Sequence, residues 1–159
     1  MPEVPGAVPP AEDVGGAVIR VVIPGEPHAQ KRHRTRVIGK HAQAYDHPDS
    51  RSWKGAAQVH MLVAMDGRPP LSGPLRLVIY AFFALPKSKH RKRVPVREAW
   101  SVKNKDADNL AKAVMDAGNG VLWGDDRQVC NLHVTKRTAA QGEAARMLVS
   151  VVELEALDE

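Results

Sequence analysis

The chain has 159 residues and a formal net charge of +5 at pH 7, with a sequence pI of about 9.6. A chain of this length normally folds as one domain, and its single cysteine, Cys130, excludes an internal disulfide and a cysteine-rich zinc cluster. No stretch is long and apolar enough to span a bilayer, and the N-terminus lacks the pattern of a signal peptide, so we expect a soluble cytoplasmic protein.

The first half of the chain predicts a tail, a strand, a basic segment and a helix. Residues 1–16 are rich in Pro, Gly and Ala without periodicity, which predicts a disordered tail. Residues 17–23, AVIRVVI, are β-branched and predict a strand that ends at a Pro-Gly turn. The segment KRHRTR, residues 31–36, is too charged for a core and is either a solvated hairpin or a strand that contacts phosphates. Apolar residues at helical spacing predict a helix within residues 46–67.

The second half alternates apolar and charged segments. Residues 75–85, LRLVIYAFFAL, predict a strand that is buried on at least one face. Residues 86–105 contain eight basic residues and one acidic residue without a regular period, which predicts a basic loop that is mobile until it binds a partner. A helix is predicted at 108–117, and two closing strands at 129–135 and 147–154.

The predicted helix at 108–117 has a polar start and an apolar face. Asp108 or Asn109 lies near its N-cap, and the sequence GNG after residue 117 would end it. The residues expected to face the core are Leu110, Ala113, Val114 and Ala117. We therefore expect one compact α+β domain over residues 17–155, in which a small mixed sheet of about four strands packs with two main helices.

Five aspartates lie within a span of 21 residues: Asp106, Asp108, Asp116, Asp125 and Asp126. If Asp106 and Asp108 lie in an extended segment, their side chains are on the same side, and the turn at 125–126 can bring a third carboxylate to them. A few carboxylates suffice for Mg²⁺, which keeps several waters and completes its shell with substrate phosphate. Such an ion polarises a phosphoryl oxygen and activates water for hydrolysis.

Two structural interpretations compete with this metal site. Asp108 could simply cap the helix while residues 125–126 form a turn, because aspartate is favoured at both kinds of position. Lys112 lies four residues after Asp108 and could either reach a scissile phosphate or form an ordinary ion pair with Asp108 or Asp116. There is no glycine-rich phosphate loop, so no nucleotide cofactor is expected.

The runs DADNLAKAVMDAGNG and VLWGDDRQV, with the earlier IPGEPHAQKRHR and LPKS, resemble the RusA family of Holliday junction resolvases, or crossover junction endodeoxyribonucleases. The similarity spans roughly residues 18–152. It implies that Asp106, Asp108 and Asp126 are catalytic carboxylates that bind metal and that Lys112 is a catalytic lysine. It gives supporting roles to the remaining motif residues, Asn109, Asp116 and Asp125.

The resemblance also implies a function. Family members are compact α+β homodimers that use Mg²⁺, with Mn²⁺ as a substitute, to nick two opposed strands of a four-way DNA junction, and many are phage or prophage proteins. Three positions depart from the family pattern: Lys105 replaces a frequent proline, Ala107 a leucine, and Gly118 a leucine, which predicts a shortened helix. None of these changes removes a predicted metal ligand.

The expected partner is branched DNA, bound through phosphate contacts that do not read sequence. Between residues 27 and 105 there are 17 lysines and arginines against four acidic residues. The predicted DNA contacts are Lys31, Arg32, Arg34, Arg36, Lys87, Lys89, Arg91, Lys92, Arg93, Lys103 and Lys105. Two other functions stay open on the sequence: a nuclease for other branched or flap DNA, and a junction-binding protein without catalytic activity.

Overall fold

The structure is a computed structural model that describes residues 18–102 and 105–156. The described elements, in chain order, are β1 (Val18–Pro24), β2 (Arg34–Ile38), β3 (His41–Tyr45), α1 (Pro48–Met65), β4 (Leu75–Phe83), the 3-10 helix η1 (Lys87–Lys89), β5 (Ala99–Trp100), α2 (Ala107–Gly118), the 3-10 helix η2 (Asp126–Gln128), β6 (Val129–Thr138) and β7 (Arg146–Glu153). No helix among them is both long and apolar enough to cross a membrane.

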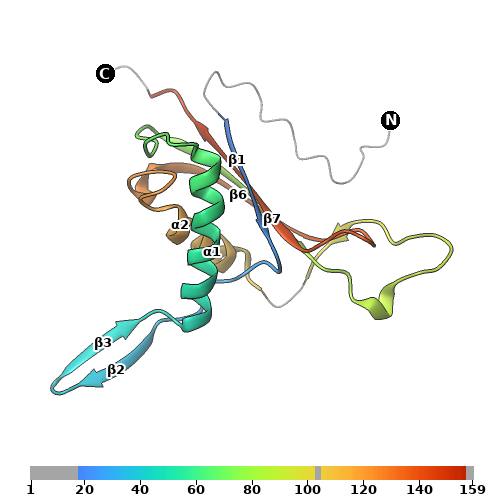
Figure 1. The fold of residues 1–159 in the computed structure, drawn as a ribbon, viewed down its shortest axis with the longest axis horizontal. Coiled ribbons are helices and arrows are strands. Elements are labelled where there is room, and N and C mark those ends of the chain that lie inside the picture. Colours follow the sequence, from blue (N-terminus) through green and yellow to red (C-terminus); the bar gives the residue numbers. More distant parts are fainter. Residues whose placement is uncertain (1–17, 103–104, 157–159) are drawn as a thin grey trace.

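The main sheet has five strands in the order β1-β7-β4-β6-β5. β4 and β6 run parallel, and the other neighbours run antiparallel, so the sheet is mixed. Helices α1 and α2 lie together on one face of it (Figure 1). The fold is therefore α+β as predicted, with one more strand in the main sheet than expected and a separate two-stranded hairpin, β2–β3.

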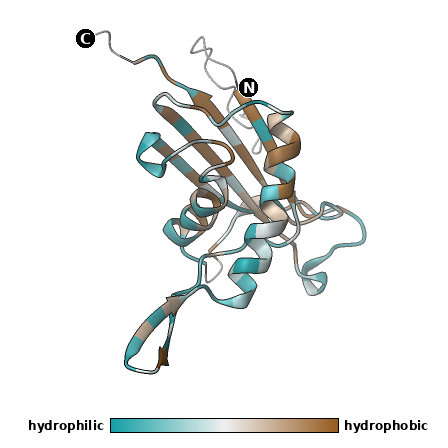
Figure 2. Cartoon of the chain, turned by 60° about the vertical axis from the view of Figure 1, so that its left-hand side comes forward, coloured by the Kyte–Doolittle hydropathy of each residue, from teal (hydrophilic) through white to brown (hydrophobic). Residues whose placement is uncertain are grey.

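Alternating burial explains why one face of the sheet binds the helices. In β1 the buried residues are Ile19, Val21 and Ile23, and the intervening side chains face away from the core. The core also takes alternate residues of β4 and β7 and the apolar side of α2, which is a strongly amphipathic helix (Figure 2). Burial of this apolar surface is the main stabilising contribution to the fold.

Several predicted elements are confirmed, with boundaries shifted by a few residues. These are β1, α1, β4, α2, β6 and β7. The basic loop predicted at 86–105 contains two short elements, η1 and β5, that its charge pattern did not indicate. The predicted tail, residues 1–16, and Lys103 lie outside the described residues.

A buried ion pair fixes the end of the basic loop to the sheet. The Arg137 Nε donates to the Glu98 carboxylate at 2.6 Å, and these side chains are only 6% and 14% exposed. The Arg137 guanidinium also lies 4.2 Å from the centre of the Trp100 ring. This arrangement joins β5 to the end of β6.

Glu98→Ala should destabilise the protein by about 3 kcal/mol, because it leaves the buried Arg137 guanidinium without its counter-charge. Urea unfolding followed by circular dichroism measures the change in the free energy of unfolding. A loss below about 1 kcal/mol, the usual range of a solvent-exposed pair, would contradict the buried character of this contact.

Candidate active site

The start of α2 holds the first two predicted metal ligands. Asp106 occupies the N-cap position with extended backbone, φ −70° and ψ 140°, but its side chain makes no capping hydrogen bond. Asp108 lies in the first helical turn, and both side chains are exposed. The sequence argument from an extended segment was therefore wrong, because the helix already begins at Ala107. Asp108 does lie near the N-cap, as predicted, two residues after Asp106. Both carboxylates instead lie at the positive end of the helix dipole.

One side of α2 carries charged groups at four-residue intervals. Leu110, Ala113, Val114 and Ala117 are buried, as predicted. Lys112 is exposed one turn after Asp108, and Asp116 is half-buried one turn further on. Of the ion pairs between described residues, none joins Lys112 to either aspartate. The Lys112 ammonium thus faces solvent beside the carboxylates.

The buried Trp123 indole fixes the position of Asp126. The Trp123 Nε1 donates a hydrogen bond of 2.9 Å to Asp126 Oδ1, and the tryptophan itself is 0% exposed. Its ring lies against Gly118, where an added Cβ would come within 2.7 Å of the ring. Gly118 therefore allows Trp123 to pack here, and it is also the last residue of α2, with Asn119 as the C-cap. Close packing of Trp123 is therefore a second reason for a glycine at this position, beside the end of the helix that the sequence predicts.

The two neighbouring aspartates of this turn have different surroundings. Asp125 is the N-cap of η2: its side chain accepts from the Arg127 backbone N at 2.8 Å and from the Arg127 guanidinium at 3.2 Å. The hydrogen bond from the Arg127 side chain is the main cause that lowers the pKa of Asp125. The Asp125 carboxylate is thus engaged by its own turn, whereas the Asp126 carboxylate accepts a hydrogen bond from Trp123 alone among the described residues.

Gln128 anchors the same turn and was not among the predicted site residues. Its Oε1 accepts from the backbone N of Gly124 and of Asp125, each at 2.9 Å. Its Nε2 donates to the carbonyl oxygens of Leu71 and Gly73, at 2.8 and 3.0 Å. The Trp-x-Asp-Asp-x-Gln spacing in the sequence was the available signal for this role.

Asp116 brings a second group of charges into the site. Burial raises its pKa, and the nearby Asp126 and Asp46 carboxylates raise it further, while Lys54 and His33 act in the opposite direction. Asp46 also forms an ion pair with His33, with 3.0 Å between the Asp46 Oδ1 and the His33 Nδ1. Asp46 is a residue that sequence reasoning missed, because only the fold brings it near Asp116.

The carboxylates of Asp106, Asp108 and Asp126 are the candidate metal ligands. Within residues 18–102 and 105–156, no three His, Cys, Asp or Glu side chains lie close enough together to hold a metal ion. No described residue donates a hydrogen bond to the carboxylate of Asp106 or Asp108, and the contact from Trp123 to Asp126 uses Oδ1 alone. Oxygen atoms are thus available at each carboxylate, and such donors suit a hard divalent cation.

The segment before the hairpin is tied to the start of α2. The Gln30 backbone N donates to the Asn109 carbonyl oxygen at 2.9 Å, and the Lys105 ammonium donates to the Pro27 carbonyl oxygen. His28 belongs to this segment and contacts α1: its Nε2 is 3.0 Å from the buried Ser50 Oγ, and its ring stacks on Trp53. These contacts place the root of the hairpin beside the acidic residues of α2.

Lowering the pH should destabilise the protein through His28. Burial lowers the pKa of His28 below 6.5, and the Lys105 and Lys31 ammonium groups lower it further. The unfolded chain therefore binds a proton more readily, so stability falls as the pH drops from 6.5 towards the folded-state pKa. Urea unfolding at pH 7.5 and pH 5.5 should show a larger loss for wild type than for His28→Gln. An equal loss in both proteins would contradict this assignment.

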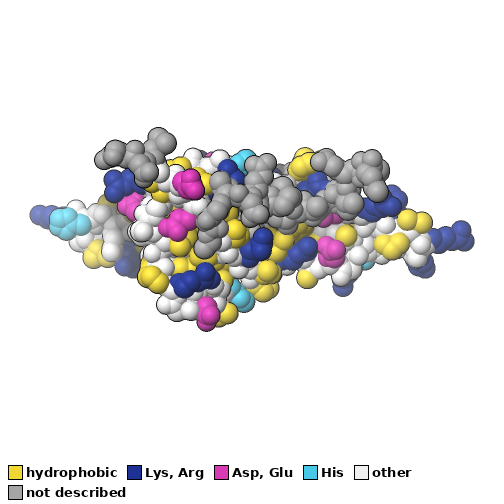
Figure 3. Space-filling model, turned by 90° about the horizontal axis from the view of Figure 1, so that it is seen from above, with side chains coloured by type: hydrophobic (Ala, Val, Ile, Leu, Met, Phe, Trp, Pro, Cys, Tyr) yellow, Lys and Arg dark blue, Asp and Glu magenta, His cyan; other side chains and the backbone are white. Residues whose placement is uncertain are grey.

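The predicted DNA contacts form two groups at opposite ends of the molecule. The hairpin carries one group and the loop around η1 carries the other, so Lys and Arg side chains gather at both ends (Figure 3). Four of the predicted contacts also have partners within the protein. Lys31 pairs with Asp49, and Lys105 lies 5.7 Å from the Phe83 ring centre. The guanidinium groups of Arg34 and Arg36 hydrogen-bond to the side chains of His47 and Gln43. The other described members of the two groups are exposed.

Gln141 closes the neck of the basic loop. Its Oε1 accepts from the Arg91 backbone N at 2.9 Å and from the Val96 backbone N at 3.2 Å. Its Nε2 donates to the Arg91 carbonyl oxygen, and its own backbone N donates to the Val96 carbonyl oxygen, both at 2.9 Å. The loop therefore presents its lysines and arginines from a hydrogen-bonded base.

Comparison with known proteins identifies the family. Residues 24–151 match the profile of the family described as endodeoxyribonuclease RusA. The chain belongs to the RusA family. It is also 30% identical over 125 residues to uncharacterized protein YqaN of Bacillus subtilis (strain 168), a match that covers 74% of this chain and 86% of that protein. The RusA family consists of deoxyribonucleases that act on Holliday junctions, so the acidic residues of α2 and of the turn at Asp126 lie in a nuclease domain.

Proposed function

We propose that the protein is a homodimeric, Mg²⁺-dependent endonuclease that resolves four-way DNA junctions by paired nicks. The observation that carries the proposal is the position of Asp126, which Trp123 holds while the adjacent Asp125 is consumed by its turn. Asp126 and the two aspartates at the start of α2 all lie within residues 24–151, which match the RusA family, and this supports a shared nuclease site. Mn²⁺ is expected to substitute for Mg²⁺, as both are hard, oxygen-binding cations.

Each group of residues has a defined task in this proposal. Asp106, Asp108 and Asp126 would hold the metal, which when bound supplies a polarised phosphoryl oxygen and an activated water. Lys112, exposed one turn along α2 from Asp108, would neutralise charge that develops on the scissile phosphate. The two basic ends of the molecule would hold phosphates of the junction arms without reading their sequence.

Two-fold symmetry explains the paired nicks. In a homodimer the same acidic site occurs twice, related by the symmetry axis, and therefore faces two symmetry-related strands of a junction. A monomer would nick one strand in each encounter. Sedimentation of the purified protein measures its oligomeric state directly.

The test is cleavage of a labelled four-way junction and of a matched linear duplex, each with Mg²⁺, with Mn²⁺ and with a chelator. Symmetric metal-dependent nicks in the junction alone are the expected result. Cleavage of flaps as readily as junctions would favour a broader branched-DNA nuclease. Tight junction binding without product in either metal would overturn the catalytic proposal and leave a binding protein.

A further inference from the structure

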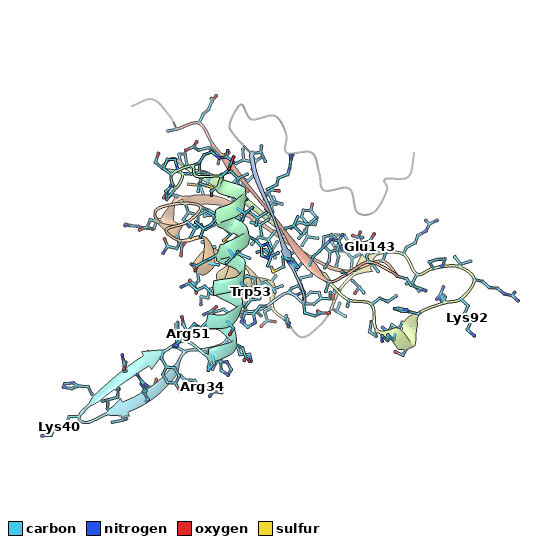
Figure 4. All side chains as sticks on the ribbon, viewed as in Figure 1. Arg34, Lys40, Arg51, Trp53, Lys92 and Glu143 are labelled. Carbon is cyan, nitrogen blue, oxygen red and sulfur yellow. The ribbon has the colours of Figure 1, made fainter. Side chains whose placement is uncertain are left out.

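The β2–β3 hairpin carries two exposed apolar side chains beside its turn. Val37 is 74% exposed and Ile38 is 53% exposed. They end β2, directly before the two-residue turn Gly39-Lys40, in which Gly39 has a φ of 62°. β2 and β3 pair with each other and not with the main sheet, and the hairpin projects from the body with Lys40 at its far end (Figure 4). The main hydrophobic core includes no residue of the hairpin.

The two faces of the hairpin differ in chemistry. Arg34, Arg36 and Ile38 alternate along β2 and share one face. On that face the Arg36 guanidinium donates to the Gln43 Oε1 at 3.2 Å and lies 5.4 Å from the Tyr45 ring centre. Val37 is on the opposite face, where its cross-strand partner is Ala42. The result is a thin ribbon with its arginines on one face, at whose tip Ile38 on that face and Val37 on the opposite face flank the turn.

The charge of the hairpin selects the partner. Residues 34–45 include Arg34, Arg36 and Lys40 and no acidic residue. A polyanion would neutralise the charge of these cations. The apolar side chains at the tip would be buried only against a partner that also has apolar surface. DNA provides both, because its phosphates bind the cations and the faces of its bases accept apolar side chains.

The root of the hairpin adjoins the candidate active site. The chain leading into β2 is hydrogen-bonded to α2 through Gln30 and Asn109. At the base of the hairpin His33 pairs with Asp46, and both groups lie within electrostatic reach of Asp116. DNA bound over the acidic residues of α2 would therefore lie beside the hairpin.

We propose that Val37 and Ile38 form a wedge that enters the branch point of bound DNA and unstacks a base pair there, while Arg34, Arg36 and Lys40 hold the flanking phosphates. The inference rests on the proposed function, because it requires branched DNA as the substrate. Removing exposed apolar side chains from water is favourable, and such side chains unstack the base step that they enter, which costs stacking free energy. That cost is smallest where pairing or stacking is already interrupted, so the wedge favours junctions over continuous duplex.

The test uses a junction with 2-aminopurine at the branch point, whose fluorescence rises when the base unstacks, in chelator so that no strand is cut. The wedge variant is Val37→Ser with Ile38→Ser. A matched control is Leu62→Ser with Val63→Ser, because these residues on α1 are 58% and 73% exposed and lie outside the hairpin. A second variant, Lys40→Ala, removes a phosphate contact and leaves the wedge intact.

At saturating protein, wild type and control should raise the fluorescence at least about twofold, and the wedge variant should lose more than about half of that rise. Lys40→Ala should weaken binding to junction and duplex alike but keep the rise at saturation. A full rise with the wedge variant, an equal loss in the control, or altered sedimentation of the wedge variant alone would overturn the inference. Wild type that binds junctions no better than duplex would instead overturn the proposed function itself.

Discussion

Asp126→Asn should lower the metal-dependent cleavage of a four-way junction by at least about 100-fold, because it removes a carboxylate ligand from the metal. The asparagine still offers a side-chain oxygen to the Trp123 Nε1, which now donates to Asp126 at 2.9 Å, so the turn should keep its shape. Junction binding in a gel-shift assay should persist, since the cations that hold phosphates are unchanged. Asp108→Asn should behave in the same way.

The adjacent residue supplies the control. Asp125→Asn should stay within about threefold of wild type, because asparagine caps a helix as well as aspartate does. The ion pair that it weakens, between Asp125 and Arg127, is exposed and contributes little to the fold. Single-turnover cleavage rates of Asp126→Asn and Asp125→Asn, each compared with wild type, test whether the two aspartates differ in role. Equal losses would show that the two aspartates do not have separate roles, and full activity of Asp126→Asn would exclude it as a metal ligand.

Periodicity was sufficient to predict the elements that build the core. The alternation in β1 and β4 and the apolar face of α2 are both consequences of burying one side of an element, so they can be read without the structure. β3 and β5 escaped prediction for a related reason. All of β3 except its last residue is fully exposed, and β5 is two residues long, so neither carries a pattern of burial.

Contacts between distant segments were beyond the reach of the sequence. The motif predicts that Asp126 is a metal ligand, but it does not predict the hydrogen bond from the Trp123 indole that orients this carboxylate. Asp46 is 70 residues from Asp116 along the chain, and only the packing of α1 against α2 brings the two acids together. For the segment KRHRTR the sequence left open a solvated hairpin and a strand that contacts phosphates. In the structure, the second half of this segment begins β2, the first strand of the hairpin. Its contact with phosphates stays a prediction.

Gly118→Ala should destabilise the protein by about 1–3 kcal/mol, although alanine is the better helix former. An added Cβ would lie 2.7 and 2.8 Å from two ring carbons of Trp123, and this ring is completely buried. The clash has to move the indole, and with it the Nε1 that donates to Asp126. Junction cleavage should therefore fall together with stability.

Gly55→Ala is the matched control, because a Cβ added at Gly55 in α1 meets nothing within 4 Å. It should stabilise the protein by about 0.5–1 kcal/mol through helix propensity alone. Urea unfolding gives the change in the free energy of unfolding for both variants, which should be a loss for Gly118→Ala and a gain for Gly55→Ala. Single-turnover cleavage, measured at a temperature where each variant is folded, separates the effect on activity from the effect on stability. If Gly118→Ala were also stabilising, Trp123 would have room to spare against α2. The hydrogen bond from Trp123 to Asp126 would then not depend on Gly118. The glycine that replaces the family's leucine would be explained by the end of the helix alone.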